Sequence, residues 1–289
     1  MKVWLDGKVV DGAEARVPVT DHGFLYGDGI FEGIRAYSGR VFRLADHMRR
    51  LASGARAVGL GLPGGLDGIR AVVLETLRAH AQPDAYVRLI VSRGVGALGV
   101  DPTTCTEPRL VCIADDVRLY SPETLARGLA LVTSSWRRPG PDVLDPRVKS
   151  LNYMNNVMAK QEARRSGADE ALLLNGRGLV AEASVANVFA VRDGRLETPP
   201  VSDGALAGIT RATVLEAADE LGISSGERSL TRFDLLDADE VFLTGSGARV
   251  VPVGSLDGSS IGSGPGAVTK RLSDAYESRV RSEGTPFLL

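Results

Sequence analysis

Hydrophobic and polar residues alternate near the start of the chain in a pattern that predicts two β-hairpins. Residues 2–10, "KVWLDGKVV", form two short apolar runs separated by Asp6-Gly7, and residues 29–44, "GIFEGIRAYSGRVFRL", form two longer runs separated by Ser38-Gly39. Short polar-Gly pairs between such runs are typical of tight hairpin turns. We therefore expect a strand pair on each side of both turns.

The spacing of apolar residues then changes to the period of an α-helix. Residues 45–60 and 66–80 each place apolar side chains three or four positions apart. Residues 85–94, "AYVRLIVSRG", and 109–114, "RLVCIA", are nearly continuous apolar runs, which predict buried strands. The apolar faces of the two helices are expected to contain Met48, Leu51 and Ala55, and Ile69, Val72, Val73 and Leu77.

A second series of elements begins at Gly128. A strand at 129–136 leads through a Pro-rich loop to a helix at 152–166, with Met154, Met158 and Ala159 on its apolar side. The elements expected after it are two hairpins that turn at Asn175-Gly176 and Asp193-Gly194, a helix at 208–223, two strands at 240–253 broken by Gly-Ser-Gly, and a last helix at 266–282.

This order of elements is not the strict strand-helix alternation of a doubly wound sheet, so it predicts an α+β fold with two domains. We expect an N-terminal α/β domain at residues 1–118 and a C-terminal domain at 128–289. Residues 119–127 carry charge, a proline and no clear period, and are expected to connect the two domains.

Composition narrows the class of protein. The 289 residues are 44% hydrophobic and 24% charged with a net charge of −2, which is typical of a soluble globular chain and argues against a nucleic-acid partner. The N-terminus lacks the apolar core of a signal peptide, and no apolar run is long enough to span a membrane. Two cysteines and three histidines in unrelated contexts suggest no metal site, so a cytoplasmic protein without a metal is expected.

Four short segments carry candidate chemistry. Lys149 lies at the junction between a strand and a helix in "PRVKSLNYMNNVMAKQEARRSG", and Glu182 interrupts an apolar strand, where a carboxylate is costly unless it has a partner. Gly208 precedes a helix whose free N–H groups and dipole can bind an anion. The Gly245-Ser246-Gly247 turn offers further N–H groups.

Each of these features alone has a simpler interpretation. Lys149 can be an exposed loop lysine, Glu182 a solvent-facing glutamate, and the two anion sites an ordinary helix start and an ordinary turn. Together they match the needs of one cofactor. A lysine forms a Schiff base with pyridoxal 5'-phosphate (PLP), a carboxylate pairs with the pyridinium nitrogen, and N–H groups at a helix start hold the phosphate.

Ten segments, in this order, resemble the class IV PLP aminotransferases, and most of all the branched-chain amino acid aminotransferases. They are "YGDGIFEGIRAY", "FRLADHMRRL", "AYVRL", "GALGVDP", "KSLNYMNNVMAKQEA", "DEALLLNGRGLVAEASVANVF", "TPP", "GITR", "ADEVFLTGS" and "VTKRL". The resemblance covers nearly the whole chain. It implies a two-domain α+β enzyme of fold type IV, with the cofactor at the domain interface, that forms a homodimer or a higher homo-oligomer.

The resemblance also implies which residues bind the cofactor. Lys149 matches the Schiff-base lysine, Glu182 the carboxylate that keeps the pyridine nitrogen protonated, and Tyr153 the tyrosine that hydrogen-bonds the phenolic oxygen. The nearby helix start and partial burial favour the neutral, nucleophilic amine of Lys149. We expect Asn152 or Ser150 to cap that helix.

The phosphate is expected to bind a second group of residues. Arg50 matches the phosphate-binding arginine, although Arg49 is adjacent and the choice between them rests on register. Ile209 and Thr210 match the cup at the helix start. Ser246 stands where the family usually has threonine, and its hydroxyl keeps a phosphate contact plausible.

The substrate is expected to meet residues from several segments. Arg88 resembles the arginine that receives the distal carboxylate of glutamate, which would let an apolar pocket accept a diacid. Gly247 follows Ser246, where alanine is common, in the turn that holds the α-carboxylate. Leu98 and Val100 lie in a loop that resembles one reaching into the neighbouring subunit's site. The other expected substrate-binding residues are Tyr26, Phe31, Gly33, Arg35 and Tyr86.

The implied reaction transfers an amino group between branched-chain L-amino acids and 2-oxoglutarate by a ping-pong mechanism, with Lys149 as base and then acid. D-amino-acid aminotransferases share "KSLN" and "YGDG", but resemble an Arg-x-His pattern where this chain has "GVGALGV". Aminodeoxychorismate lyases share "KSLNY" and generally lack "FEGIRAY". An (R)-amine transaminase would differ in pocket geometry alone. Nothing is missing from the predicted site that would favour a non-catalytic cofactor-binding protein.

Overall fold

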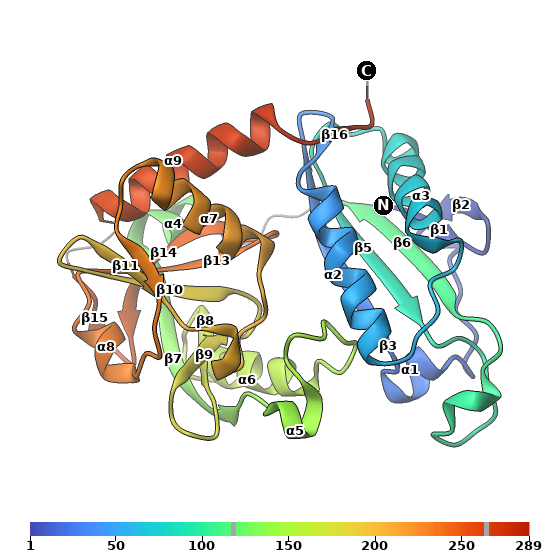
Figure 1. The fold of residues 1–289 in the computed structure, drawn as a ribbon, viewed down its shortest axis with the longest axis horizontal. Helices are drawn as coiled ribbons and strands as arrows, with labels where there is room; N and C mark the ends of the chain where they lie inside the picture. The colour runs from blue at the N-terminus through green and yellow to red at the C-terminus, as the bar shows by residue number, and fades with distance from the viewer. Residues whose placement is uncertain (117–119, 263–265, 289) are drawn as a thin grey trace. The chain divides into compact units, whose positions relative to one another are not determined.

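The computed structural model describes residues 1–116, 120–262 and 266–288, which form two compact units (Figure 1). Unit 1 consists of Met1–Val117, Val148–Asn152 and Val280–Leu289, and unit 2 of Arg118–Arg147 and Tyr153–Arg279. Strands and helices mix in both units, as expected for an α+β fold. The expected boundary at residues 118 and 119 lies outside the described residues.

Two segments that the sequence division places in the C-terminal domain group with unit 1 instead. The Lys149 carbonyl accepts a hydrogen bond from the Phe31 N–H at 2.9 Å, and the Leu151 N–H donates to the Gly29 carbonyl at 2.9 Å. Near the C-terminus, Thr285 pairs with Val41. Backbone hydrogen bonds to unit 1 therefore decide where these segments belong, and sequence order does not reveal them.

Unit 1 is built on an antiparallel sheet whose strand order is β16-β4-β3-β5-β6-β1-β2. Helices α2 and α3 lie on the viewer's side of this sheet in Figure 1, and a short helix α1 and a 3-10 turn η1 lie in its loops. The bounds are β1 (Lys2–Leu5), β2 (Lys8–Asp11), α1 (His22–Tyr26), β3 (Gly29–Tyr37), β4 (Arg40–Val41), α2 (Leu44–Ala57), α3 (Gly65–His80), β5 (Ala85–Ser92), η1 (Pro102–Thr104), β6 (Arg109–Asp115) and β16 (Thr285–Pro286).

The predicted hairpins and helices of unit 1 are confirmed. Asp6 and Gly7 have φ values of 52° and 85°, and Ser38 and Gly39 have 48° and 77°, as a two-residue turn with both central residues left-handed requires. The predicted apolar faces of α2 and α3 are buried against the sheet. Helix α1 was not expected from the sequence; its N-cap Asp21 accepts a hydrogen bond from the Gly23 N–H.

Strand β3 is buried along its whole length and presents two different faces. Ile30, Ile34 and Ala36 belong to the apolar core under α2 and α3. Because side chains alternate along a strand, Phe31 and Arg35 point to the opposite face. The predicted site residues of unit 1 thus divide between the two faces of one sheet.

Unit 2 is built on a sheet in the order β12-β11-β10-β13-β14-β7-β8-β9, with β15 paired to β14. Its apolar core and a smaller alanine-rich cluster between α6 and β8 hold the helices to the strands. The bounds are α4 (Pro122–Arg127), β7 (Leu129–Arg137), α5 (Pro141–Leu144), α6 (Met154–Arg165), β8 (Glu170–Leu174), β9 (Val180–Ala183), β10 (Asn187–Arg192), β11 (Arg195–Thr198), η2 (Val201–Asp203), α7 (Ile209–Glu220), β12 (Ser225–Glu227), α8 (Arg232–Leu236), β13 (Glu240–Gly245), β14 (Arg249–Leu256), β15 (Ser259–Ser260) and α9 (Ala267–Ser282).

Unit 2 differs from the sequence-based expectations in local structure. The end of the predicted connection is the helix α4, capped by Ser121, and the Pro-rich loop contains α5. The buried side of α6 consists of Asn156, Ala159 and Ala163, while Met154 is 71% exposed. The face of a helix with scattered apolar residues is set by what it packs against, here β7 and β8.

The first hairpin of unit 2 also turns differently from the prediction. The Asn175 side chain accepts hydrogen bonds from the N–H groups of Arg177 and Leu179, and Gly178 has the left-handed φ of 79°. This makes a longer loop than a turn centred on Asn175-Gly176. The other predicted turn, at Asp193-Gly194, is confirmed by φ values of 48° and 73°.

Candidate active site

Lys149 lies at the edge of the unit 1 sheet, against an aromatic ring. Its Nζ is 4.6 Å from the centre of the Phe31 ring, and the Arg88 guanidinium carbon is 4.4 Å from the same centre. The backbone hydrogen bond from Phe31 to Lys149 and the bridge between Ile30 and Ser150 fix this position. Two cationic side chains therefore meet one ring, an arrangement stabilised by the ring's negative face.

The register between β3 and β5 brings four predicted substrate residues together. Gly33 lies opposite Arg88 and Arg35 opposite Tyr86, so their side chains share the face of Phe31. Arg88 NH2 donates a hydrogen bond to the Tyr86 hydroxyl at 3.1 Å. A Cβ added to Gly33 would come within 2.3 Å of that hydroxyl oxygen. The absence of a side chain at Gly33 thus makes room for the Tyr86 hydroxyl.

The opposite face of β3 holds a charged group that the sequence did not predict as part of the site. Glu32 is fully buried and accepts hydrogen bonds from Arg50 Nε at 2.8 Å and Arg50 NH2 at 2.7 Å. His47 Nδ1 is 2.7 Å from Glu32 Oε2, the oxygen that Arg50 NH2 also contacts. By contrast, Arg49 points to solvent with 79% of its side chain exposed and pairs with Asp46. Arg50 is the arginine that the helix directs towards the sheet.

The buried charges shift two pKa values. Burial disfavours the Glu32 anion, but the Arg50 guanidinium and the hydrogen bonds from Arg50 and His47 outweigh it and lower the pKa of Glu32 to about 2. Burial lowers the pKa of His47, Glu32 acts against this, and the positive Arg50 and Lys149 add to the lowering. At neutral pH, His47 is therefore a neutral donor to an ionised Glu32.

Tyr26 anchors a loop. Its hydroxyl accepts a hydrogen bond from the Gly99 N–H at 2.8 Å, and the ring of His22, from the same helix, lies 2.9 Å from the Ala97 carbonyl. Leu98 and Val100 flank Gly99 and are each 80% exposed. Within one chain, Tyr26 thus holds the segment that carries Leu98 and Val100.

In unit 2, the Glu182 carboxylate lies in a buried strand and has three polar partners. Arg138 NH2 is 2.9 Å from Oε1, while the Asn187 side-chain amide and the Leu206 N–H donate to Oε2 at 3.1 and 3.0 Å. The side chains of Glu182 and Arg138 are 7% and 9% exposed. The simpler interpretation of Glu182 as a solvent-facing residue is therefore wrong.

Two elements that the sequence predicts to bind an anion also belong to unit 2. Helix α7 begins after Gly208 without a side-chain cap, and its first residues Ile209 and Thr210 are buried. A Cβ on Gly208 would come within 1.9 Å of Asn187 Oδ1, so only glycine allows this approach. Register also pairs Asn187 with Thr244, two residues before Ser246. An uncapped helix start of this length is a general anion site.

The helix that follows Lys149 starts differently from the prediction. Tyr153, half-buried, is the N-cap residue of α6 and makes no side-chain cap. Asn152 donates its amide to the Gly27 carbonyl at 2.9 Å, and the Ser150 hydroxyl accepts from the Asn152 N–H at 3.3 Å. Both side chains hold the loop, so neither caps α6.

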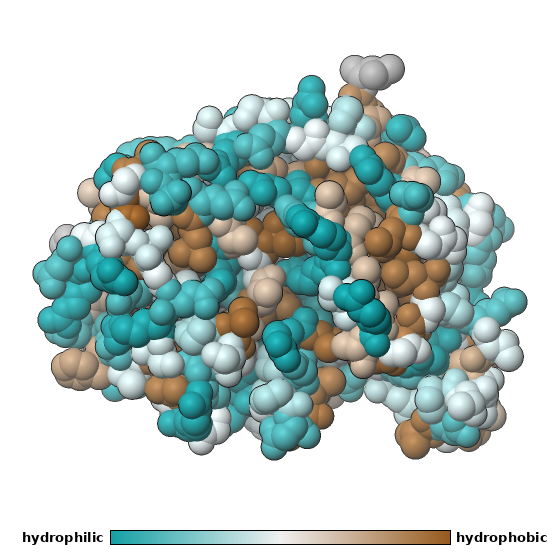
Figure 2. All heavy atoms as spheres, viewed as in Figure 1, coloured by the Kyte–Doolittle hydropathy of each residue, from teal (hydrophilic) through white to brown (hydrophobic). Residues whose placement is uncertain are grey.

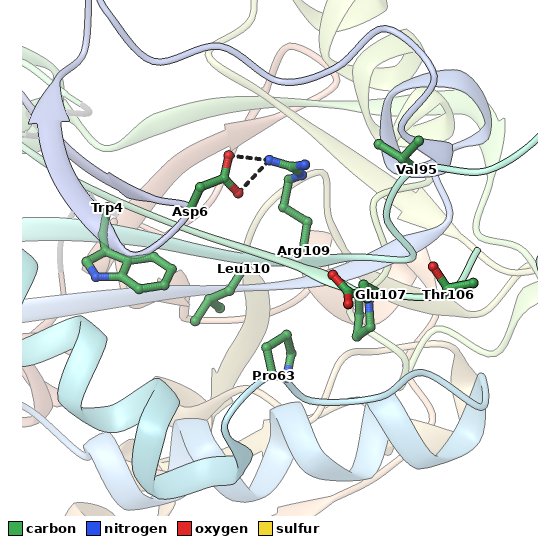
Figure 3. A pocket seen from close by; sticks show the side chains of 9 residues that line it. Trp4, Asp6, Pro63, Val95, Thr106, Glu107, Arg109 and Leu110 are labelled. Carbon is green, nitrogen blue, oxygen red and sulfur yellow. Dashed lines mark hydrogen bonds and ion pairs between the residues drawn. The ribbon is translucent and has the colours of Figure 1, made fainter.

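A separate hollow of about 340 Å³ lies in unit 1 beside β1 and the start of β6 (Figure 3). Arg109 NH1 there contacts both carboxylate oxygens of Asp6 at 2.6 Å. Its walls consist of Trp4, Asp6, Pro63, Val95, Thr106, Glu107, Pro108, Arg109 and Leu110. None of the predicted site residues lines this hollow.

Comparison with known proteins decides the family. A model of the family "Amino-transferase class IV" matches residues 29–256. The chain belongs to the class IV aminotransferases. This confirms the predicted family and, with the structures described next, the fold type IV architecture and the cofactor PLP.

Relatives of this aminotransferase extend over almost all of its length. A putative branched-chain-amino-acid aminotransferase of Methanocaldococcus jannaschii is 47% identical over 96% of each chain. A D-alanine aminotransferase of Bacillus licheniformis is 34% identical over 98% of each chain.

Solved structures agree with this assignment. The branched-chain amino acid aminotransferase of Escherichia coli is 34% identical, with a TM-score of 0.93 over 98% of this chain and 96% of that one. The T.th. branched-chain amino acid aminotransferase complexed with N-(5'-phosphopyridoxyl)-L-glutamate is 36% identical, with a TM-score of 0.91 over 97% and 94%.

The residues present suit PLP. Unit 1 offers an amine on an aromatic face and the inward-facing Arg50, and unit 2 offers a buried carboxylate beside an uncapped helix start. The sequence missed Glu32, His47 and Arg138 as partners of these groups. Only Glu32 gave a signal, since it is a carboxylate within a largely apolar strand.

Proposed function

We propose that this PLP-dependent aminotransferase exchanges the amino group between branched-chain L-amino acids and 2-oxoglutarate. The observation that carries the proposal is the pairing of an apolar ring with a cation on one sheet face. Phe31 is buried, and Arg88 lies over it with its guanidinium held by Tyr86. Such a face can contact an aliphatic side chain and can also bind a distal carboxylate.

The proposal extends to the residues that bind the cofactor. We infer that Lys149 bonds to PLP, that Glu182 accepts the hydrogen bond of the ring nitrogen, and that Tyr153 donates to the phenolic oxygen. Arg50, the first turn of α7 with Ile209 and Thr210, and Ser246 would bind the phosphate, because each presents N–H or O–H groups to an anion. When bound, PLP supplies the electron sink that makes the Cα–H bond of an amino acid acidic.

The chain's own groups then move one proton. With PLP bound, the amine of Lys149 would act as the base that takes the proton from the substrate's Cα and then as the acid that returns it. Phe31 covers the amine on one side and limits its access to water. Gly247, in the turn after Ser246, would hold the α-carboxylate through backbone N–H groups. Arg35 and Tyr86, opposite one another, close the substrate face.

The exposed loop supports a further part of the proposal, a homodimer or higher homo-oligomer. Leu98 and Val100 are large apolar side chains at 80% exposure, on a loop fixed by Tyr26 and His22. Apolar groups held in a defined position at a surface are typical of an interface. We infer that they line the substrate pocket of a neighbouring copy. Figure 2 shows hydrophobic residues lying among hydrophilic ones on the face in view.

We propose a cytoplasmic enzyme, supported by its small-molecule substrates and by Cys105 and Cys112, which are both free thiols. Among the described residues, every helix is too short or too polar to cross a lipid bilayer.

A panel of half-reactions tests the proposal. The holoprotein is mixed with single amino donors, and conversion of the cofactor to its aminated form is followed by absorbance. L-leucine, L-isoleucine, L-valine and L-glutamate should convert it within seconds. D-alanine, (R)-1-phenylethylamine and aminodeoxychorismate should react at least about a hundredfold more slowly, a difference of roughly 3 kcal/mol in barrier. Faster conversion by D-alanine than by L-leucine would replace the proposal with the D-specific reaction.

A further inference from the structure

Arg138 is buried in unit 2 and held by three acceptors. Its Nε donates to the Gly204 carbonyl at 3.2 Å, NH1 to Asn156 Oδ1 at 3.1 Å, and NH2 lies 2.9 Å from Glu182 Oε1. Asn156 is itself fixed, because its amide donates to the Ser184 carbonyl at 2.6 Å. The guanidinium therefore has one orientation, and one of its three nitrogens is directed at Glu182.

The contacts of Glu182 are unequal on its two oxygens. Oε2 accepts from the Asn187 amide and from the Leu206 N–H, which occupies both of its lone pairs. Oε1 forms an ion pair with Arg138 NH2 at 2.9 Å, and neither the Asn187 amide nor the Leu206 N–H donates to it. A carboxylate oxygen can accept two hydrogen bonds, so one position on Oε1 remains for a further donor.

Charge gives Arg138 a role that neutral donors cannot fill. Asn187 and Leu206 are uncharged, and Glu182 is 7% exposed, so Arg138 is the positive group that offsets burial of the carboxylate. Removing it would leave a buried anion with neutral partners only. Such a group would turn towards solvent and would then be a poorer acceptor for a pyridinium N–H.

We propose that Arg138 is a positioning residue for catalysis, which holds the Glu182 carboxylate through its ion pair and directs Oε1 at the ring nitrogen of PLP. The proposal rests on the inferred role of Glu182. It predicts that Arg138 strengthens cofactor binding through the ring nitrogen alone, and not through the phosphate or the lysine.

An analogue with CH in place of the ring nitrogen separates these contributions. Dissociation constants for PLP and for the analogue are measured by spectroscopic titration of the cofactor-free full chain and of Arg138→Met. In Arg138→Met, the dissociation constant for PLP should rise about ten- to hundredfold, the range for a hydrogen bond to a charged group, and that of the analogue by less than about twofold. Arg138→Lys, which keeps the charge, should recover part of the PLP affinity.

Arg195→Met is the matched control, since Arg195 is 55% exposed and pairs with Glu197 at 3.4 Å in the same unit. It should change neither constant. Equal losses for PLP and the analogue in Arg138→Met would overturn the proposal by showing a general structural role, as would unchanged affinity for both.

A second comparison keeps the test decisive if Arg138→Met is unstable. In a Glu182→Gln background, Arg138→Lys should have no further effect on PLP binding, whereas an additive loss would contradict a role exerted through Glu182. Failure of the proposed function gives a different result. The wild-type chain would then bind PLP and the analogue equally well.

Discussion

Glu32 and Arg50 are joined by two parallel hydrogen bonds, of 2.8 Å from Nε and 2.7 Å from NH2, beneath the sheet face that carries Phe31 and Lys149. This fork geometry fixes the plane of the guanidinium. A guanidinium has five N–H donors, and these two bonds occupy two of them. Glu32 therefore determines where the other donors of Arg50 point, and so the direction from which an anion such as phosphate can be bound.

Glu32→Gln should weaken PLP binding and destabilise unit 1. The amide cannot pair with the charge of Arg50, and breaking a buried ion pair costs about 3 kcal/mol or more in the free energy of unfolding. Urea unfolding and titration with PLP measure the two effects. Asp11→Asn is the control, because its ion pair with Lys2 lies at the surface of unit 1, and it should leave both quantities unchanged. A Glu32→Gln protein with wild-type PLP affinity would show that Arg50 does not depend on Glu32.

The lowered pKa values of Glu32 and His47 predict that the protein is less stable in acid. The folded-state pKa of Glu32, about 2, lies below its ordinary value of 4.5, so its contribution is present above pH 4.5 and is lost as pH falls towards 2. The total is roughly 3 kcal/mol. The pKa of His47 is also lowered in the folded chain. As pH falls below 6.5, the histidine therefore binds a proton in the unfolded chain before it does so in the folded one, and the free energy of unfolding decreases.

Thermal unfolding between pH 8 and 4 checks this prediction. The midpoint should be constant above pH 7 and fall below pH 6.5, before the Glu32 window is reached. In His47→Gln, the fall between pH 6.5 and 5 should become smaller, because the titrating group is gone. A midpoint that rises on acidification from pH 7 to 5 would contradict the direction of the His47 shift.

Arg88→Met should separate the two substrates of the ping-pong cycle. The kcat/KM for 2-oxoglutarate should fall about a hundredfold or more, because a charged hydrogen-bonding partner of the distal carboxylate is lost. The value for 4-methyl-2-oxopentanoate should change by less than about threefold, since its side chain has no charge to pair. Arg70→Met, on the exposed side of α3, is the control. An equal loss for both oxo acids would reject the diacid role.

Gly33→Ala should disturb substrate binding without unfolding the protein. Its methyl group would come within 2.3 Å of the Tyr86 hydroxyl oxygen, so Tyr86 must move and Arg88 loses its 3.1 Å contact. We expect KM for L-leucine to rise about tenfold, as the loss of one aligned contact would produce. Gly61→Ala should have no effect, because its methyl group meets nothing closer than Pro108 at 3.4 Å. Unchanged kinetics in Gly33→Ala would show that Tyr86 does not shape the pocket.

Local sequence chemistry was enough to predict much of the fold. The turns at Asp6-Gly7, Ser38-Gly39 and Asp193-Gly194 followed from residues that accept left-handed backbone, and the cores of α2 and α3 followed from clear periodicity. The buried side of α6 did not follow. Its apolar residues are scattered, and β7 and β8 select the alanine face.

Long-range partners were beyond prediction for a different reason. Arg138 and Glu182 are far apart in sequence and share no pattern, and the backbone of Lys149 joins β3 across more than a hundred residues. The resemblance to a family supplied the list of site residues. It did not supply the contacts that hold them, such as those of Glu32 with Arg50, which only the structure shows.

The attachment of PLP to Lys149 is the central claim, and mapping the modified lysine tests it most directly. The chain has five lysines, and Lys2, Lys160 and Lys270 each pair with a carboxylate, whereas Lys149 lies on the Phe31 ring. Reduction of the holoprotein with sodium borohydride makes a lysine–PLP bond permanent, and peptide mass spectrometry locates it. The label is predicted on Lys149 alone. A label on Lys160 or any other lysine, or no label, would contradict the account.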